Sequence, residues 1–86
     1  MENLFVLVQR NLNGLVHIES TNDLIDAIAK QKALLVGTDP AFMKNILTKD
    51  EIDGVIDRLE KWHQDRLFND EEEVLIIWLP KRDKLR

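Results

Sequence analysis

The apolar residues of this chain fall into short runs and helical stripes, which polar turn signals separate. Residues 4–8 (LFVLV) are apolar at every position, which predicts an inner strand whose two faces both need cover. Asn13 and Gly14 lie between apolar residues and predict a two-residue type I′ turn, followed by a second strand over residues 15–19. The chain is therefore expected to begin with a β-hairpin.

A helix and a third strand are predicted next. Ser20 and Asp23 resemble a capping box with Asp in place of Glu, and apolar residues at helical spacing continue up to Lys30. Residues 33–36 (ALLV) form a continuous apolar run that ends at Gly37. This run predicts a buried strand reached by a helical crossover.

A short helix and a long helix are predicted after that strand. Asp39 is a typical capping residue, and Pro40 after it is the residue favoured at the first helical position. Thr48 and Glu51 have the spacing of a full capping box and open a long amphipathic helix. Its apolar stripe is predicted to contain Ile52, Val55, Ile56, Leu59, Trp62 and Leu67. Its polar side is predicted to contain Asp50, Asp53, Asp57, Glu60, Lys61, Gln64 and Asp65.

The last apolar run, residues 74–79 (VLIIWL), stops at Pro80 and predicts a final strand. The expected order is strand, strand, helix, strand, short helix, long helix, strand. This order predicts one α+β domain over residues 1–80, with a mixed sheet of about four strands packed by helices. Residues 81–86 follow it as a basic tail.

Three of the predicted strands are apolar on both faces, but only one long helix and two short helices are available to cover them. One face of the sheet could therefore be left uncovered. A homodimer formed through that face would bury it, and helices divided between the two faces would do so as well. The sequence leaves both alternatives open.

The composition indicates a folded domain, because the 86 residues are 44% hydrophobic and 33% charged and include only three Gly and two Pro. The chain has no cysteine, which excludes disulfides and thiolate chemistry and is compatible with a reducing cytosol. A cytoplasmic location is expected. No membrane association is expected, because the apolar runs are too short to cross a bilayer and the N-terminus lacks the pattern of a secretory signal.

Negative charge is concentrated between residues 50 and 73, which contain ten acidic and three basic side chains. Such a concentration favours cationic partners and disfavours bare nucleic acid. The predicted partner-binding residues are Asp50, Asp53, Asp57, Glu60, Asp70, Glu71, Glu72 and Glu73. A metal site is not predicted among them, because neither the helix nor the acidic run supplies a loop that wraps an ion.

Catalytic motifs are not recognisable in the chain. Ser20 is the only serine and is explained as a helix cap, and the His17-x-Glu19 pair lacks the cysteines that accompany it in zinc deaminases. No catalytic residue, metal or cofactor is therefore predicted. Trp62 and Trp78 lie in apolar patterns and are expected in the core, whereas an exposed tryptophan would mark a binding face.

Together these features predict a small, acidic, non-catalytic interaction protein. The expected partner is a basic, nucleic-acid-handling protein surface, which the chain would inhibit or modulate as small phage and mobile-element proteins do. One alternative is an enzyme or small-ligand site at a homodimer interface, with candidate residues His17, Glu19, Asp39 and His63. Another is weak nucleic-acid binding by the tail, through Lys81, Arg82, Lys84 and Arg86.

Overall fold

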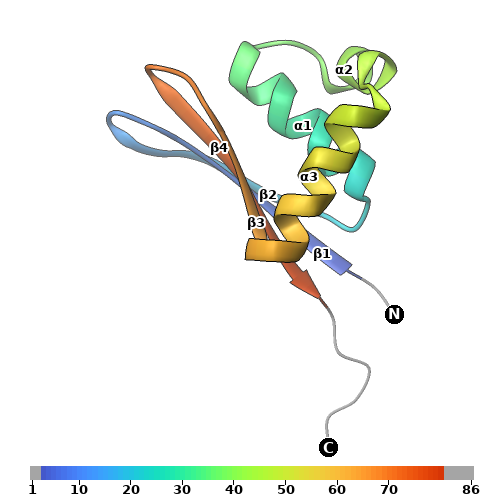
Figure 1. Ribbon diagram of the computed structural model, residues 1–86. Coiled ribbons are helices and arrows are strands. Elements are labelled where there is room, and N and C mark those ends of the chain that lie inside the picture. The colour runs from blue at the N-terminus through green and yellow to red at the C-terminus, as the bar shows by residue number, and fades with distance from the viewer. Residues whose placement is uncertain (1–2, 81–86) are drawn as a thin grey trace, which may run out of the picture.

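A computed structural model describes residues 3–80 of the chain. Its strands are β1 (Asn3–Asn11), β2 (Gly14–Thr21), β3 (Gln64–Phe68) and β4 (Glu72–Pro80). They form one antiparallel sheet in the order β2-β1-β4-β3. The helices are α1 (Leu24–Val36), α2 (Pro40–Ile46) and α3 (Lys49–Trp62), and they lie together on one side of the sheet (Figure 1).

The predicted α+β class is confirmed, but the predicted element order is wrong at two places. The observed order is β-β-α-α-α-β-β, because residues 33–36 end helix α1 instead of forming a strand, and β3 follows α3. The sheet is accordingly antiparallel throughout and not mixed. The expected helical crossover to a parallel strand does not occur among residues 3–80.

Helix α1 begins later and ends later than its sequence signals indicated. Its N-cap is Asp23, whose side chain accepts a hydrogen bond from the Ile25 backbone at 3.1 Å, whereas Ser20 belongs to β2. Gly37 closes the helix in the left-handed conformation, at φ 76°, and its N–H donates to the Ala33 carbonyl. The helix therefore extends six residues beyond Lys30 and brings residues 33–36 to the helical layer.

Helix α3 begins as predicted and ends earlier. The Thr48 N–H donates to the Glu51 carboxylate at 2.9 Å and the Glu51 N–H donates to the Thr48 hydroxyl at 3.1 Å, which is the predicted capping box. At the other end His63 adopts a left-handed conformation, with φ 60°, and its N–H donates to the Leu59 carbonyl. The chain turns into β3 there, so Asp65 and Leu67 are strand residues and not members of the helix.

Strand β1 is an inner strand, as predicted, because it pairs with β2 on one side and with β4 on the other. The β1–β2 hairpin is also confirmed, but the predicted turn is wrong. Asn11 pairs with Gly14, so Leu12 and Asn13 are the central turn residues, and His63 is the only non-glycine residue with positive φ between residues 3 and 80. Gly14 itself has a φ of 120°, and it begins β2.

The hydrophobic core lies between the helices and one face of the sheet. Its buried members are Phe5, Leu7, Ala27, Ile28, Val55, Leu59, Val74 and Ile76. No helix within residues 3–80 is both long and apolar enough to cross a membrane. The basic tail, with its predicted nucleic-acid-binding residues, lies outside the described residues.

Candidate functional site

The face of the sheet opposite the helices carries a second set of apolar side chains. Successive strand residues point to opposite faces, so Phe5 and Leu7 point into the core while their neighbours on β1 point away from it. The cross-strand partners of those neighbours on β2 and β4 share this outer face. Its apolar members, which we name the open face, are Leu4, Val6, Val8, Leu15, Ile18, Leu75, Ile77 and Leu79.

The open face is uncovered, because its members pack against one another within the sheet and do not belong to the core cluster beneath the helices. Ile18 is 57% exposed and Leu79 is 49% exposed. The other members on β1 and β4 are half-buried by their neighbours. Contiguous apolar surface of this kind marks an interaction site. The sequence indicated that one face of the sheet could lack cover, and a single chain does have such a face.

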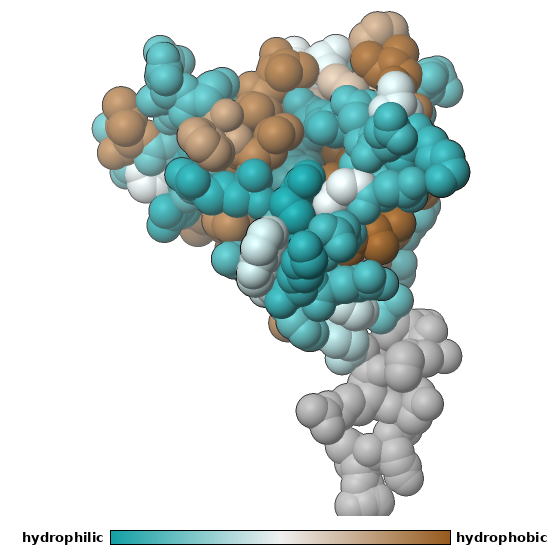
Figure 2. Space-filling model, in the orientation of Figure 1, coloured by the Kyte–Doolittle hydropathy of each residue, from teal (hydrophilic) through white to brown (hydrophobic). Residues whose placement is uncertain are grey.

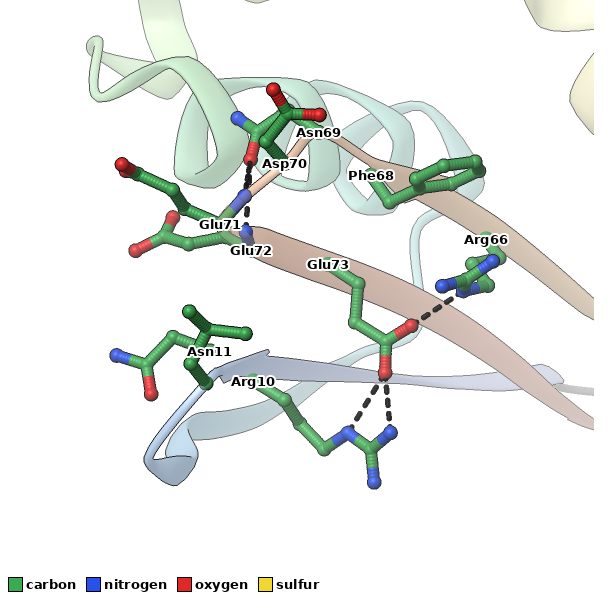
Figure 3. Close-up of a pocket in the computed structure, with 10 residues that line it drawn as sticks. Arg10, Asn11, Arg66, Phe68, Asn69, Asp70, Glu71, Glu72 and Glu73 are labelled. Atoms are coloured by element: carbon green, nitrogen blue, oxygen red, sulfur yellow. Dashed lines mark hydrogen bonds and ion pairs between the residues drawn. The ribbon is translucent and has the colours of Figure 1, made fainter.

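One end of the open face, next to the hairpin tips, is charged. Glu73 lies between two arginines there, with contacts of 2.6 and 2.8 Å from Arg10 to one carboxylate oxygen and a hydrogen bond from Arg66 to the other (Figure 3). The Glu73 side chain is only 13% exposed. The hydrogen bonds from Arg66 and Arg10 hold the pKa of Glu73 below its ordinary value. Glu73 is thus tied into the face and not offered to a partner.

The flank of the open face along β3 is aromatic and basic. The Arg66 guanidinium lies 4.2 Å from the centroid of the Phe68 ring, and Phe68 is 58% exposed. Trp62 is 62% exposed and lines a shallow depression with Arg58 and Arg66, so its predicted place in the core is wrong. Exposed Trp, Phe and Arg side chains are the residue types enriched in protein interfaces.

The other tryptophan, Trp78, is half-buried, packs against the core and stacks on His63 with ring centroids 5.1 Å apart. Its prediction as a packing residue holds. The sequence did not separate the two tryptophans because Trp62 falls on the apolar stripe of α3, yet it is the last residue of that helix and extends past the sheet that covers the rest of the stripe. Because the predicted helix continued to Leu67, the sequence offered no signal that Trp62 lies at a helix end.

The predicted acidic surface of α3 is present as an exposed row of carboxylates on the side of the helix away from the core. Asp53 lies 2.8 Å from Lys49, and Asp57 lies 3.3 Å from Lys61. Asp50 and Glu60 have no ion-pair partner within residues 3–80. Exposed pairs of this kind contribute little to stability, and they halve the free negative charge of the row.

The other predicted acidic residues lie in and after the β3–β4 turn, at the far end of β3. Asp70 and Glu71 are exposed, whereas Glu72 accepts a hydrogen bond from Gln9 at 3.2 Å. Strand β3, about 17 Å long, separates this turn from the end of α3, so the structure divides the predicted acidic region into two places. Both hairpin tips border a depression of about 250 Å³, and the apolar surface near them shows as brown areas at the upper left of Figure 2.

The residues of the alternative enzyme site are not brought together within one chain. His17 and Glu19 lie 3.4 Å apart on β2, Asp39 caps α2, and His63 stacks on Trp78. No hydrogen bond or ion pair connects these three places among the described residues. Between residues 3 and 80, no group of three or more His, Asp or Glu side chains is arranged to hold a metal ion.

Comparison with protein-family models, with curated proteins and with solved structures gives no match for this chain.

Proposed function

We propose that this protein is a non-catalytic protein-interaction domain and that the open face is its binding surface. The observation that carries the proposal is the uncovered apolar sheet face, which lies opposite the helix-covered core and is bordered by exposed Trp62, Arg66 and Phe68. An apolar centre with an aromatic and arginine border is the composition of a protein–protein interface.

The carboxylates of α3 support a finer proposal about the kind of partner. The open face and the outer side of α3 are on opposite sides of the molecule, so a partner on one leaves the other accessible. Dense negative charge on a helix speeds association with a basic surface and competes there with phosphate. We infer that the second surface favours a basic, nucleic-acid-handling protein, which the domain would inhibit or modulate.

The test is a quantitative pull-down that uses the tagged full chain as bait. The bait is incubated with a nuclease-treated lysate of the source organism to which the untagged chain has been added. Wild type is compared with Ile18→Lys on the open face and with the matched control Ile46→Lys on α2, where the native residue is 50% exposed. A charged ammonium group on an apolar interface carries a large desolvation cost. We expect a stoichiometric protein, whether the untagged copy or another chain, to be captured by wild type and by Ile46→Lys and to be lost with Ile18→Lys.

Capture of no stoichiometric protein by wild type, or equal capture by all three baits, would contradict the use of the open face. The basic-partner proposal is tested with a fourth bait in which Asp50, Asp53 and Asp57 become Asn and Glu60 becomes Gln. This bait keeps the shape of the row and removes its charge. It should lose any partner bound through α3, and unchanged capture would contradict the electrostatic role.

A further inference from the structure

We propose that the open face is covered by a second copy of this chain, in a symmetric homodimer that stacks the two sheets face to face. This proposal rests on the proposed function, because it names the occupant of the same surface. Sheets that stack in this way lie about 10 Å apart, with their side chains interdigitating. A two-fold interface requires one self-complementary patch, and the open face is such a patch.

The area of the sheet is the first argument. The four strands contain 9, 8, 5 and 9 residues. At about 3.3 Å along the strand and about 4.8 Å between strands, their face covers roughly 500 Å². Two copies would therefore bury about 1,000 Å² together, which reaches the lower limit of a specific interface. A reversible, concentration-dependent dimer is the expected result.

The distribution of charge is the second argument. Each chain has a formal net charge of −4, so two copies repel unless their negative surfaces are kept apart. Within residues 3–80, the carboxylates without an ion-pair partner lie on α3, at the N-caps of α1 and α2, and in or just after the β3–β4 turn, whereas the one acidic group of the open face, Glu73, is already paired with Arg10 and Arg66. Stacking through the open face therefore directs the α3 carboxylates of the two copies in opposite directions and brings no unpaired carboxylate of the face into the interface.

Pairing of sheet edges is a competing mode of self-association, and β2 is the longer of the two edge strands. Strand β2 is an eight-residue edge strand whose outer backbone groups have no strand partner among residues 3–80. Pairing of two such edges would extend the sheet to both sides and would leave the open face of each copy exposed. The stacked dimer covers that face, which is why we favour it, and the cross-linking measurement below separates the two modes.

The first experiment is sedimentation equilibrium of the purified full chain over about 5 to 500 µM, the range in which interfaces at the lower size limit associate. Wild type should shift from the 10.1 kDa monomer to twice that mass. Ile18→Lys, and Leu79→Lys as a second variant at a 49% exposed position, should raise the dissociation constant at least about tenfold. Ile46→Lys should match wild type. Circular dichroism confirms that each variant is folded.

The second experiment locates the interface by cross-linking. Val8 lies near the centre of the open face, between its cross-strand partners Ile18 and Leu75. In a two-fold stack, Val8 of one chain therefore faces Val8 of the other. Because the chain has no cysteine, Val8→Cys introduces a single thiol. A short bifunctional thiol reagent should link Val8→Cys into a covalent dimer, and should not link Ile46→Cys.

Two results would overturn the proposal. Wild type that stays monomeric throughout the range would show that a second copy does not cover the face, and the pull-down would then decide the proposed function by itself. A dimer that forms equally with Ile18→Lys and gives no Val8→Cys cross-link would place self-association elsewhere on the molecule.

Discussion

The side-chain amide nitrogen of Gln31 in α1 lies 3.2 Å from both the carboxylate and the backbone carbonyl oxygen of Asp65 in β3. The same nitrogen lies 3.1 Å from the Val74 carbonyl of β4, and Arg58 of α3 pairs with the other Asp65 carboxylate oxygen. Gln31 is fully buried and Asp65 is 3% exposed. This polar cluster therefore connects both long helices to β4 and to β3, the strand that the sequence pattern did not predict.

Replacement of Asp65 tests the importance of that cluster. Asp65→Ala removes the carboxylate that accepts from Gln31 and Arg58, and it should lower the free energy of unfolding by about 2 to 4 kcal/mol. The matched control is Asp57→Ala, which removes a carboxylate from an exposed pair with Lys61 and should cost less than about 0.5 kcal/mol. Urea denaturation at one fixed protein concentration measures both. Similar losses in the two variants would show that the buried cluster contributes no more than a surface pair.

The apolar stripe of α3 makes a second prediction. Leu59 is 3% exposed in the core, so Leu59→Ala should lower the free energy of unfolding by about 2 to 5 kcal/mol through lost burial and a cavity. Leu12 at the tip of the β1–β2 hairpin is 85% exposed, and Leu12→Ala should cost less than about 0.5 kcal/mol. Thermal and urea unfolding would measure the two. A loss below about 1 kcal/mol for Leu59→Ala would mean that α3 packs through another face.

Two glycines should respond to substitution with opposite signs. Gly14 has a φ of 120°, and a Cβ there meets nothing within 4 Å, so Gly14→Val should destabilise by about 1 to 2 kcal/mol through backbone strain and not through a clash. Gly54 lies inside α3, and its Cβ would meet the flexible Arg58 guanidinium at 3.4 Å. Gly54→Ala should stabilise by about 0.5 to 1 kcal/mol, because Ala favours the helix. A neutral Gly14→Val would contradict the observed hairpin backbone.

The pH dependence of stability should report on Glu73. Because its pKa in the folded protein is lowered from the ordinary value of 4.5, Glu73 contributes stability that is present above that value and is lost as the pH falls through the folded pKa. Glu73→Gln should therefore be less stable than wild type at pH 7, and the difference should shrink towards pH 3. Urea denaturation across this range is the measurement. Glu71→Gln, at an exposed turn position, is the control and should show no such difference. A stability difference for Glu73→Gln that is equal at all pH values would contradict the lowered pKa of Glu73.

Several local elements were determined by short-range chemistry and were predicted correctly. Asp39 before Pro40 and the Thr48–Glu51 capping box begin α2 and α3, because these side chains satisfy backbone N–H groups within three residues. The run of residues 4–8 forms an inner strand because its core side needs helical cover and its neighbours pair on both edges. The sequence also indicated an uncovered sheet face, because its predicted strands have more apolar surface than its helices could cover.

The arrangement of the charged residues was less well predicted, because it depends on elements that meet only in three dimensions. The acidic residues between 50 and 73 are one region of the sequence, but β3 divides them in space. Glu73 is also paired with Arg10, which lies 63 residues earlier in the chain. Arg66 and Phe68 lie beside the open face because their segment forms β3. The sequence pattern instead predicts that this segment is helical.

Short-range signals in the sequence were enough to predict the starts of α2 and α3, the inner strand, the last strand and the excess of apolar strand surface, since each depends on residues close together in the chain. The start of α1 at Asp23, its continuation past Lys30 and the formation of β3 after His63 depend instead on contacts between distant parts of the chain. Gln31 lies just beyond Lys30, the predicted end of the first helix, and Asp65 was predicted on the polar side of the long helix. The Gln31 amide donates to the buried Asp65 carboxylate across 34 residues of sequence, and no local pattern records that hydrogen bond.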